Sequence, residues 1–221
     1  MTQPTLKIRP IAISICIAVL FGLAVFYLTS PPSGKSVREN TQADAQAAAN
    51  TGGRLAAYAT GTLADMLVHP APKELPEIRF FNADKKQQGL ADFAGEVLVI
   101  NFWATWCAPC RAEMPALEAL QKHFDGRNMR VLAISLDRGK PEKPKAFLAE
   151  LNLTALDFYH DPKNASARAI GAFGLPTTLI VDQTGKELAR LPGEAEWDAA
   201  EVVALIEALL NEEKLANNPA G

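Results

Sequence analysis

The residues whose types and spacing could carry out chemistry are Cys107 and Cys110, in the segment NFWATWCAPCRAEMP. They follow an apolar run that predicts a strand buried on both faces, and they open a helix expected from about Cys107 to Phe124. The free N–H groups of a first helical turn stabilise an anion. A thiol in such a place can have a pKa of roughly 3.5 to 7.5 instead of about 8.5. The pattern therefore favours an attacking thiolate at Cys107 and a resolving thiol at Cys110.

Two other uses of the cysteine pair remain open. A structural zinc site normally needs a second Cys/His pair, and His69, His123 and His160 do not form one. A purely structural disulfide is the other alternative, although closing so short a loop adds little entropic stabilisation. We expect no metal and no cofactor beyond a redox-active Cys107–Cys110 disulfide, with copper binding at His160 as a further alternative.

Strands and helices alternate in the chain around the cysteines. The apolar runs MRVLAISL and TTLIVD predict buried strands, and TTLIVD pairs with ELARLPG in an expected hairpin. Between the strands, stretches such as EKPKAFLAEL have helical spacing, and WDAAEVVALIEALL predicts a closing amphipathic helix. This order predicts an α/β fold in which helices flank a central mixed β-sheet.

The amino-terminal part of the chain has a different character. Residues 11–28, IAISICIAVLFGLAVFYL, carry no charge and approach the roughly 20 apolar residues of a membrane-spanning helix. Lys7 and Arg9 precede this run, which favours residues 1–10 in the cytoplasm and export of the rest. A cleaved signal peptide is the alternative, although its apolar run is usually about 7 to 15 residues long. Cys16 lies inside the run and is expected to face lipid.

The rest of the chain divides into three predicted parts. Residues 29–73 have the composition of a spacer, with a possible helix over 54–67 where apolar residues recur at helical spacing. Residues 74–211 form the expected folded domain, and 212–221 an expected frayed tail. The net charge of -3 gives no reason to expect a nucleic-acid partner, which normally needs a basic face.

Several motifs resemble the thioredoxin-like family in order and context. FWATWCAPC holds the cysteine pair, Pro115 lies inside the following helix, and GLPTTLIVD begins at Gly174. With the apolar segment 11–28, the chain is most similar to the TlpA group, the membrane-anchored periplasmic thiol:disulfide oxidoreductases of bacteria. The resemblance covers roughly Arg54 to Leu210. It implies a thioredoxin-like domain in the periplasm, held at the inner membrane by one transmembrane helix.

The resemblance also implies roles for single residues. Pro176 is implied to be a cis-proline that faces the cysteines, the alternative being an ordinary turn proline. Leu175 then offers backbone groups to an extended substrate segment. Trp106 is implied to belong to an exposed docking surface, although it could simply pack. The implied substrate-contacting residues are Trp106, Ala108, Pro109, Leu175 and Thr177.

Asn101 is where the sequence departs from cytoplasmic thioredoxins, which resemble it closely here but carry a buried aspartate as proton acceptor. An amide cannot accept that proton, so the base must be absent or lie elsewhere. Glu113 lies three residues after Cys110 on the same helix face, and membrane-anchored reductases of the cytochrome-maturation type carry a glutamate at this place. We expect Glu113 to be the relocated base, the alternative being a solvated helix glutamate.

The resemblance implies partners as well as an activity. Clients are expected to be exported proteins with cysteine pairs, either copper-site assembly proteins of haem-copper oxidases or apocytochrome c. An integral-membrane thiol reductant is expected to supply electrons. Ala108 adds no charge or imidazole between the cysteines, so a reducing poise is favoured.

Two other functions remain as alternatives. A membrane-tethered copper chaperone is one, although chaperones of the Sco type place three residues between their cysteines, whereas this chain has two. A thiol peroxidase is the other. Peroxiredoxins share the fold, but they carry a threonine three residues and a proline seven residues before the reactive cysteine, where this chain has Ala104 and Ile100.

Overall fold

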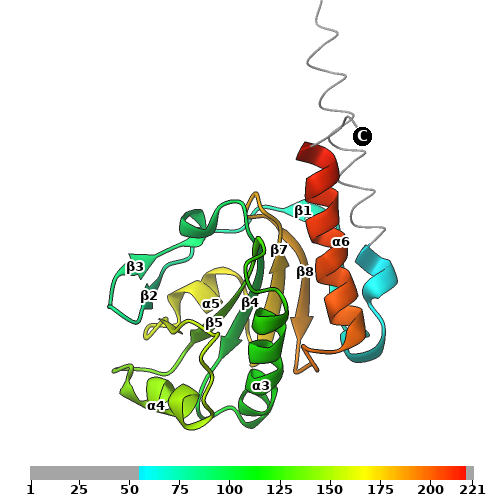
Figure 1. Cartoon of the computed structure of the whole chain (residues 1–221). Helices are drawn as coiled ribbons and strands as arrows, with labels where there is room; N and C mark the ends of the chain where they lie inside the picture. The colour runs from blue at the N-terminus through cyan, green and yellow to red at the C-terminus, as the bar shows by residue number, and fades with distance from the viewer. Residues whose placement is uncertain (1–54, 218–221) are drawn as a thin grey trace, which may run out of the picture. The chain divides into compact units, whose positions relative to one another are not determined.

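The computed structural model describes residues 55–217 and the side chains of residues 55–211. One eight-stranded sheet has the strand order β1-β8-β7-β4-β5-β6-β2-β3 (Figure 1). The strands are β1 (Leu67–Lys73), β2 (Phe80–Asn82), β3 (Gln87–Gln88), β4 (Val97–Trp103), β5 (Met129–Ser135), β6 (Tyr159–His160), β7 (Thr177–Val181) and β8 (Glu187–Pro192). The helices are α3 (Ala108–His123), α4 (Glu142–Glu150), α5 (Ala165–Ala169) and α6 (Ala200–Asn217), with 3-10 turns η1 (Ala56–Tyr58), η2 (Gly61–Leu63) and η3 (Leu90–Phe93).

Strand β4 lies in the middle of the sheet and ends just before the cysteines. All seven of its residues are buried, as expected for a strand covered on both faces. It pairs in parallel with β5 and antiparallel with β7, so the sheet is mixed, as the sequence predicts. Asn101 lies between Ala133 of β5 and Thr178 of β7 in this register. Its side chain is thus held in the centre of the sheet.

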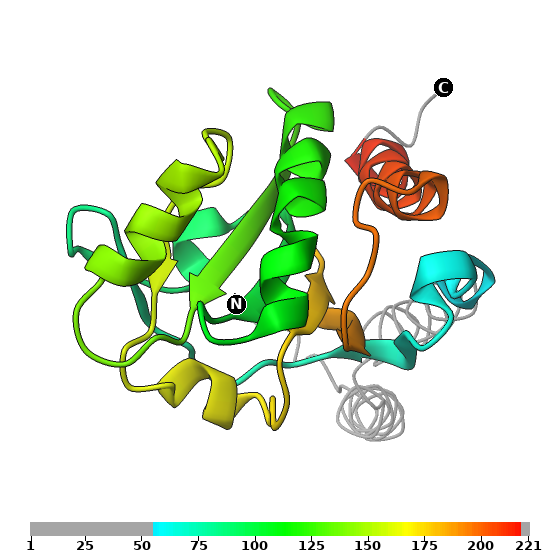
Figure 2. The same cartoon turned by 90° about the horizontal axis from the view of Figure 1, so that it is seen from below.

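Helices cover the two faces of the sheet. Alternate residues of β4 point to opposite faces: Val99 and Trp103 join the core under α3, α4 and α6, whereas Ile100 and Phe102 join the core under α5 and η3. Figure 2, seen from below, shows α3 and α6 on one side of the sheet and α5 on the other. Strand β4 therefore places the start of α3 at the carboxyl end of the central strands, above a core that is packed on both faces of the sheet.

The predicted helix over 54–67 is wrong. The chain there makes the turns η1 and η2, and Leu67 already begins β1, which pairs with β8. Gly61 has φ +55, and a Cβ at this position would collide with Glu201 of α6. The Glu201 carboxylate also accepts a hydrogen bond from the Thr62 backbone N–H at 2.9 Å. Docking on α6 thus outweighs the local helical spacing.

The predicted domain boundaries 74 and 211 are also too narrow. Strand β1 brings residues 67–73 into the sheet, although Pro70 and Pro72 hide it in the sequence, because proline is tolerated in an edge strand. Helix α6 continues to Asn217, beyond the expected start of a frayed tail at 212.

The predicted membrane-spanning segment over residues 11–28 lies outside the described residues, as does the predicted spacer up to residue 54. Within the part of the chain that the structure describes, no helix combines the length and apolar character needed to cross a membrane.

Candidate active site

Cys107 and Cys110 form a disulfide at the start of α3. Cys107 is the N-cap of this helix, and its sulfur accepts a hydrogen bond from the Cys110 backbone N–H at 3.3 Å. Cys107 is 6 % exposed, whereas Cys110 is 0 % exposed. Pro109 occupies the first turn, where its missing N–H costs the helix nothing. Only Cys107 is therefore within reach of another protein, and the helix end stabilises negative charge on its sulfur.

A buried polar network holds the loop that precedes Cys107. Asp137, after β5, accepts hydrogen bonds from the Thr105 backbone N–H at 2.9 Å, the Thr105 hydroxyl at 2.5 Å and the Ser135 hydroxyl at 3.0 Å. The His160 ring Nε2 lies 2.6 Å from the Asp137 backbone oxygen. The spacing of these residues in the sequence does not reveal the network, because its members come from three strand ends that only the fold brings together.

The loop before β7 forms the opposite wall of the site. The peptide bond between Leu175 and Pro176 is cis, the conformation that the resemblance implies. The Pro176 carbonyl accepts from the Gly193 N–H at 2.9 Å, and the Thr177 hydroxyl donates to the Gly174 carbonyl at 2.7 Å. Thr177 is thus buried by its own loop, although substrate contact was expected there.

A groove of about 590 Å³ lies between this loop and Cys107. Trp106, Pro109 and Leu175 line it, in agreement with their expected place near the substrate, whereas Ala108 does not. Phe173 and Arg168 line it as well, although neither residue was predicted to belong to the site. The side chain of Trp106 is 66 % exposed and that of Phe173 is 96 % exposed. A phenylalanine two residues before the Leu-Pro bond is the signal that could have revealed this part of the site.

Glu113 is buried on α3, one helical turn after Cys110, and is not the solvated glutamate of the alternative. Its Oε1 accepts from the Asn101 side-chain amide at 2.7 Å. Its Oε2 accepts from the Trp197 indole N–H at 2.9 Å and from the Ala195 backbone N–H at 3.2 Å. Three neutral donors therefore surround this carboxyl group.

Burial raises the pKa of Glu113 from 4.5 to about 7. Hydrogen bonds from Trp197, Asn101 and Ala195 favour the carboxylate but do not offset the lost hydration, and the negative charge of Glu194 adds to the rise. Glu113 also lines a hollow of about 350 Å³ together with Glu194 and Glu196. The group can therefore hold a proton near neutral pH beside a route to solvent.

Asn101 links Glu113 to the centre of the sheet. Its amide nitrogen also donates to the Thr178 hydroxyl at 2.9 Å, while its Oδ1 has no hydrogen-bond partner among the described groups. The Asn101 amide thus fixes the carboxyl group of Glu113 without providing a base itself.

Each of the three histidines has a contact with a residue other than the cysteines. His160 contacts Asp137, His69 Nε2 lies 2.8 Å from the Glu187 carboxylate, and the His123 ring packs on Phe124. Among the described residues, no three Cys, His, Asp or Glu side chains are grouped as metal ligands would be.

Comparison with known proteins identifies the family. Residues 71–186 match the AhpC/TSA family. The chain belongs to this family. It is 33 % identical over 137 residues to the thiol:disulfide interchange protein HelX of Rhodobacter capsulatus, covering 58 % of this chain and 71 % of that one. It is 29 % identical over 122 residues to the thiol-disulfide oxidoreductase ResA of Bacillus thuringiensis, covering 55 % and 69 %.

A solved structure also resembles this member of the AhpC/TSA family. The fold matches a crystal structure described as a thiol:disulfide interchange protein DsbE from Chlorobium tepidum with a TM-score of 0.57 and 29 % identity, covering 63 % of this chain and 96 % of that one. The thioredoxin-like fold and the thioredoxin-like family predicted from the sequence are thereby confirmed. The protein is a thiol:disulfide oxidoreductase.

Proposed function

We propose that this oxidoreductase is a reductase of disulfides in exported client proteins. In this proposal, the N-terminal segment 11–28 anchors it in the bacterial inner membrane and the thioredoxin-like domain works in the periplasm. The observation that carries the proposal is the asymmetry of the cysteine pair, in which Cys107 borders an apolar groove and Cys110 is fully buried.

The reaction begins with the reduced dithiol. The Cys107 thiolate attacks one sulfur of the client disulfide, a Cys107–client bond forms, and the client's other sulfur leaves as a thiolate. Cys110 then attacks the Cys107 sulfur, and the second client sulfur leaves. Two electrons pass to the client, and the enzyme is left with the Cys107–Cys110 disulfide. A membrane-embedded dithiol restores the reduced pair by the same exchange in reverse.

Glu113 supports the second step in this proposal. Cys110 must lose its proton before it can attack, and Glu113 is the buried carboxyl group one helical turn away. A base with a pKa of about 7 is matched to work near neutral pH. The hollow shared with Glu194 and Glu196 returns the proton to solvent.

The clients we propose are proteins of cytochrome oxidase copper-site assembly or apocytochrome c, whose cysteines must be reduced before they take up metal or haem. HelX and ResA are named for thiol:disulfide exchange, which is the reaction that these clients would need. A solved structure of this fold that is 25 % identical to this chain is an exposed lipoprotein thioredoxin of Streptococcus pneumoniae, which supports a place outside the cytoplasm.

The proposal is tested by trapping the client. A full-length Cys110→Ala variant, expressed in its host, leaves the mixed disulfide at Cys107 unresolved, so covalent complexes with exported proteins should accumulate and disappear on treatment with dithiothreitol. A Cys107→Ala variant is the matched control and should give none. If neither variant captures an exported protein, client reduction is refuted.

The direction of electron flow is tested separately. A redox titration of the full-length protein against glutathione gives the reduction potential of the Cys107–Cys110 couple, and we expect a reducing value. A potential near about -120 mV, typical of strong oxidants of this fold, would show that the protein introduces disulfides instead.

A further inference from the structure

We propose that the groove beside Cys107 selects clients in which the attacked cysteine is flanked by a large apolar side chain and by acidic residues. Phe173 contacts the client's apolar side chain, and Arg168, with neighbouring cations, attracts the client's acidic residues. This proposal rests on the proposed reduction of client proteins and names the class of segment that the site accepts.

The groove is built to cover an apolar side chain. Its volume of about 590 Å³ falls in the range of small-ligand pockets, roughly 300 to 1,000 Å³. Leu136, Ala167, Ala172 and Leu175 contribute apolar surface, and the Cys107 sulfur that reacts lies at its border. A client whose cysteine reaches Cys107 therefore places the neighbouring residues of its chain in this groove.

Packing inside the protein does not explain the exposure of the Phe173 side chain. Its ring is 96 % exposed, in the loop that leads to the Leu175–Pro176 bond. Gly171 has φ +73, and the Cε2 atom of the Phe173 ring lies 3.6 Å from the position that a Cβ on Gly171 would take. An aromatic ring so exposed gains its stabilisation only when another surface covers it. With Trp106 on the same groove, Phe173 provides a second aromatic contact for a client.

The charges around the groove have one sign. Arg168 is the only charged residue that lines it. Residues 136–141 and 161–174 include Leu136 and most of the other residues that line the groove; both acidic residues of these segments are buried and hydrogen-bonded, so their exposed charges are all positive. These exposed cations are Arg138, Lys140, Lys163 and Arg168. None of the four has an ion-pair partner among the described residues.

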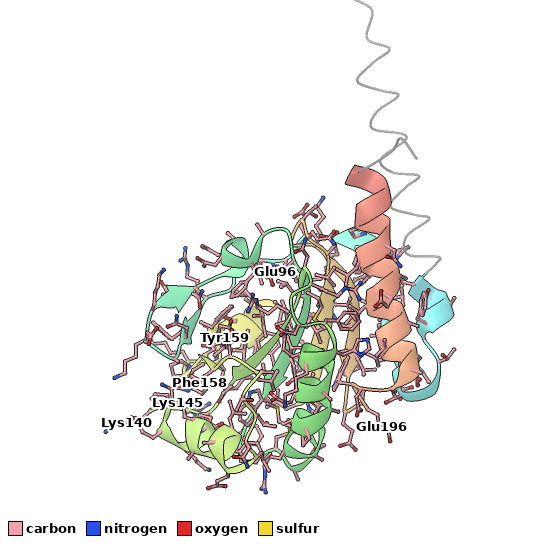
Figure 3. The ribbon with its side chains drawn as sticks, in the orientation of Figure 1. Glu96, Lys140, Lys145, Phe158, Tyr159 and Glu196 are labelled. Atoms are coloured by element: carbon pink, nitrogen blue, oxygen red, sulfur yellow. A yellow bond between two sulfur atoms is a disulfide. The ribbon has the colours of Figure 1, made fainter. Side chains whose placement is uncertain are left out.

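The exposed side chains on the far side of the active site carry charge of the opposite sign. Residues 193–199, between β8 and α6, expose only acidic charges, at Glu194, Glu196 and Asp198. Figure 3 shows Lys140 and Glu196 on opposite sides of the same end of the molecule, where β4 runs into α3. A client segment that carries negative charge is therefore drawn to the groove side and repelled from the side of Glu113. This charge difference is what favours an acidic client.

The test uses full-length reduced protein and short peptides. Each peptide carries one cysteine as a mixed disulfide with thionitrobenzoate, whose release on attack by Cys107 is followed by absorbance. Four peptides combine Phe or Ala on one side of the cysteine with Glu or Lys on the other. Each protein molecule turns over once, and we expect the second-order rate constant of thionitrobenzoate release to be about three- to tenfold higher for Phe than for Ala, and about five- to tenfold higher for Glu than for Lys at low salt.

Variants separate the two contacts. Arg168→Glu should reverse or abolish the preference for Glu, whereas Lys86→Glu, which makes the same charge change in the β2–β3 turn outside the groove, should keep it. Phe173→Ser should abolish the preference for Phe, whereas Leu151→Ser, at an exposed apolar residue outside the groove, should keep it. Raising the salt concentration should weaken only the charge preference.

A disulfide without flanking residues distinguishes the two proposals. Reduction of 2-hydroxyethyl disulfide should be equal in the wild type and in the Lys86 and Leu151 control variants, which lie outside the groove, and urea unfolding shows whether the Arg168 and Phe173 variants are folded. If the wild type reduces neither this compound nor any peptide, the proposed function fails. If it reduces all four peptides equally well, the reductase activity stands and the selectivity proposed here is refuted.

Discussion

Replacing Glu113 by glutamine should change how stability depends on pH. The Glu113 carboxyl group has a pKa of about 7 in the folded protein against 4.5 for an ordinary glutamate. The folded state therefore binds up to one more proton than the unfolded chain between these values. The free energy of unfolding consequently falls as pH rises through this window and is level above it. Glu113→Gln removes the ionisable group and with it this fall.

The size of the effect follows from the two pKa values. Between pH 5 and pH 8 the wild type loses about 2.5 kcal/mol at this site, because each pKa unit is worth about 1.4 kcal/mol. Glutamine retains an oxygen to accept from Trp197 and Ala195, but its amide meets the Asn101 amide, which costs about 1 kcal/mol at any pH. The variant should thus be slightly less stable than the wild type at pH 5 and more stable at pH 8.

Urea unfolding of the oxidised protein, followed by tryptophan fluorescence at several pH values, measures this difference. Glu118 supplies a matched control, because it is a second buried glutamate on α3. Burial alone would raise its pKa, but hydrogen bonds from Lys122 and from the backbone at 154–156 lower it. Glu118→Gln should therefore cost more stability at pH 8 than at low pH. If the difference between Glu113→Gln and wild type stays constant from pH 5 to pH 8, the assigned pKa is wrong.

Three further predictions concern the surroundings of the site. Trp197→Phe removes one donor to the Glu113 carboxylate, so the pH midpoint for resolution of a Cys107 mixed disulfide should rise by about one unit, measured by stopped-flow kinetics. Asp137→Asn weakens the hold on Thr105; it should cost about 2 kcal/mol in urea unfolding and change the rate of alkylation of reduced Cys107. Glu187→Gln leaves Arg190 and His69 without their buried partner and should cost about 2 to 4 kcal/mol at pH 7. Partner hydrogen bonds outweigh burial and lower the pKa of Glu187, so this cost should shrink at strongly acid pH, as thermal unfolding will show.

The sequence predicts the centre of this fold better than its edges. Strand β4 and the start of α3 follow from an uninterrupted apolar run and a helix-start pattern, both of which are local signals. Strand β1 gives no such signal, because the hydrogen bonds of β8 hold it in place and Pro70 and Pro72 interrupt its pattern. The helix predicted over 54–67 failed for a related reason, since Glu201, far along the chain, decides the conformation at Gly61.

The same distinction applies to the site. Cys107, Cys110 and Glu113 lie on one helix, so their spacing alone predicts that they share a region. Two of the three donors to the Glu113 carboxyl group come from the loop after β8, 82 and 84 positions away in sequence. Neither Trp197 nor the network of Asp137 can be found by spacing, because each depends on which strand ends meet at the sheet edge.

The start of α3 separates two tasks that a disulfide reductase must keep apart. Cys107 faces the apolar, cationic groove, where a client's sulfur can dock, whereas Glu113 faces an acidic hollow that leads to solvent. A negative charge near Cys107 would disfavour its thiolate, so an acidic client needs the cations around Arg168 as compensation. At Glu113, burial keeps the proton bound near neutral pH, and the negative charge of Glu194 adds to this effect. One helix end can therefore carry a nucleophile that must remain ionised and a base that must titrate.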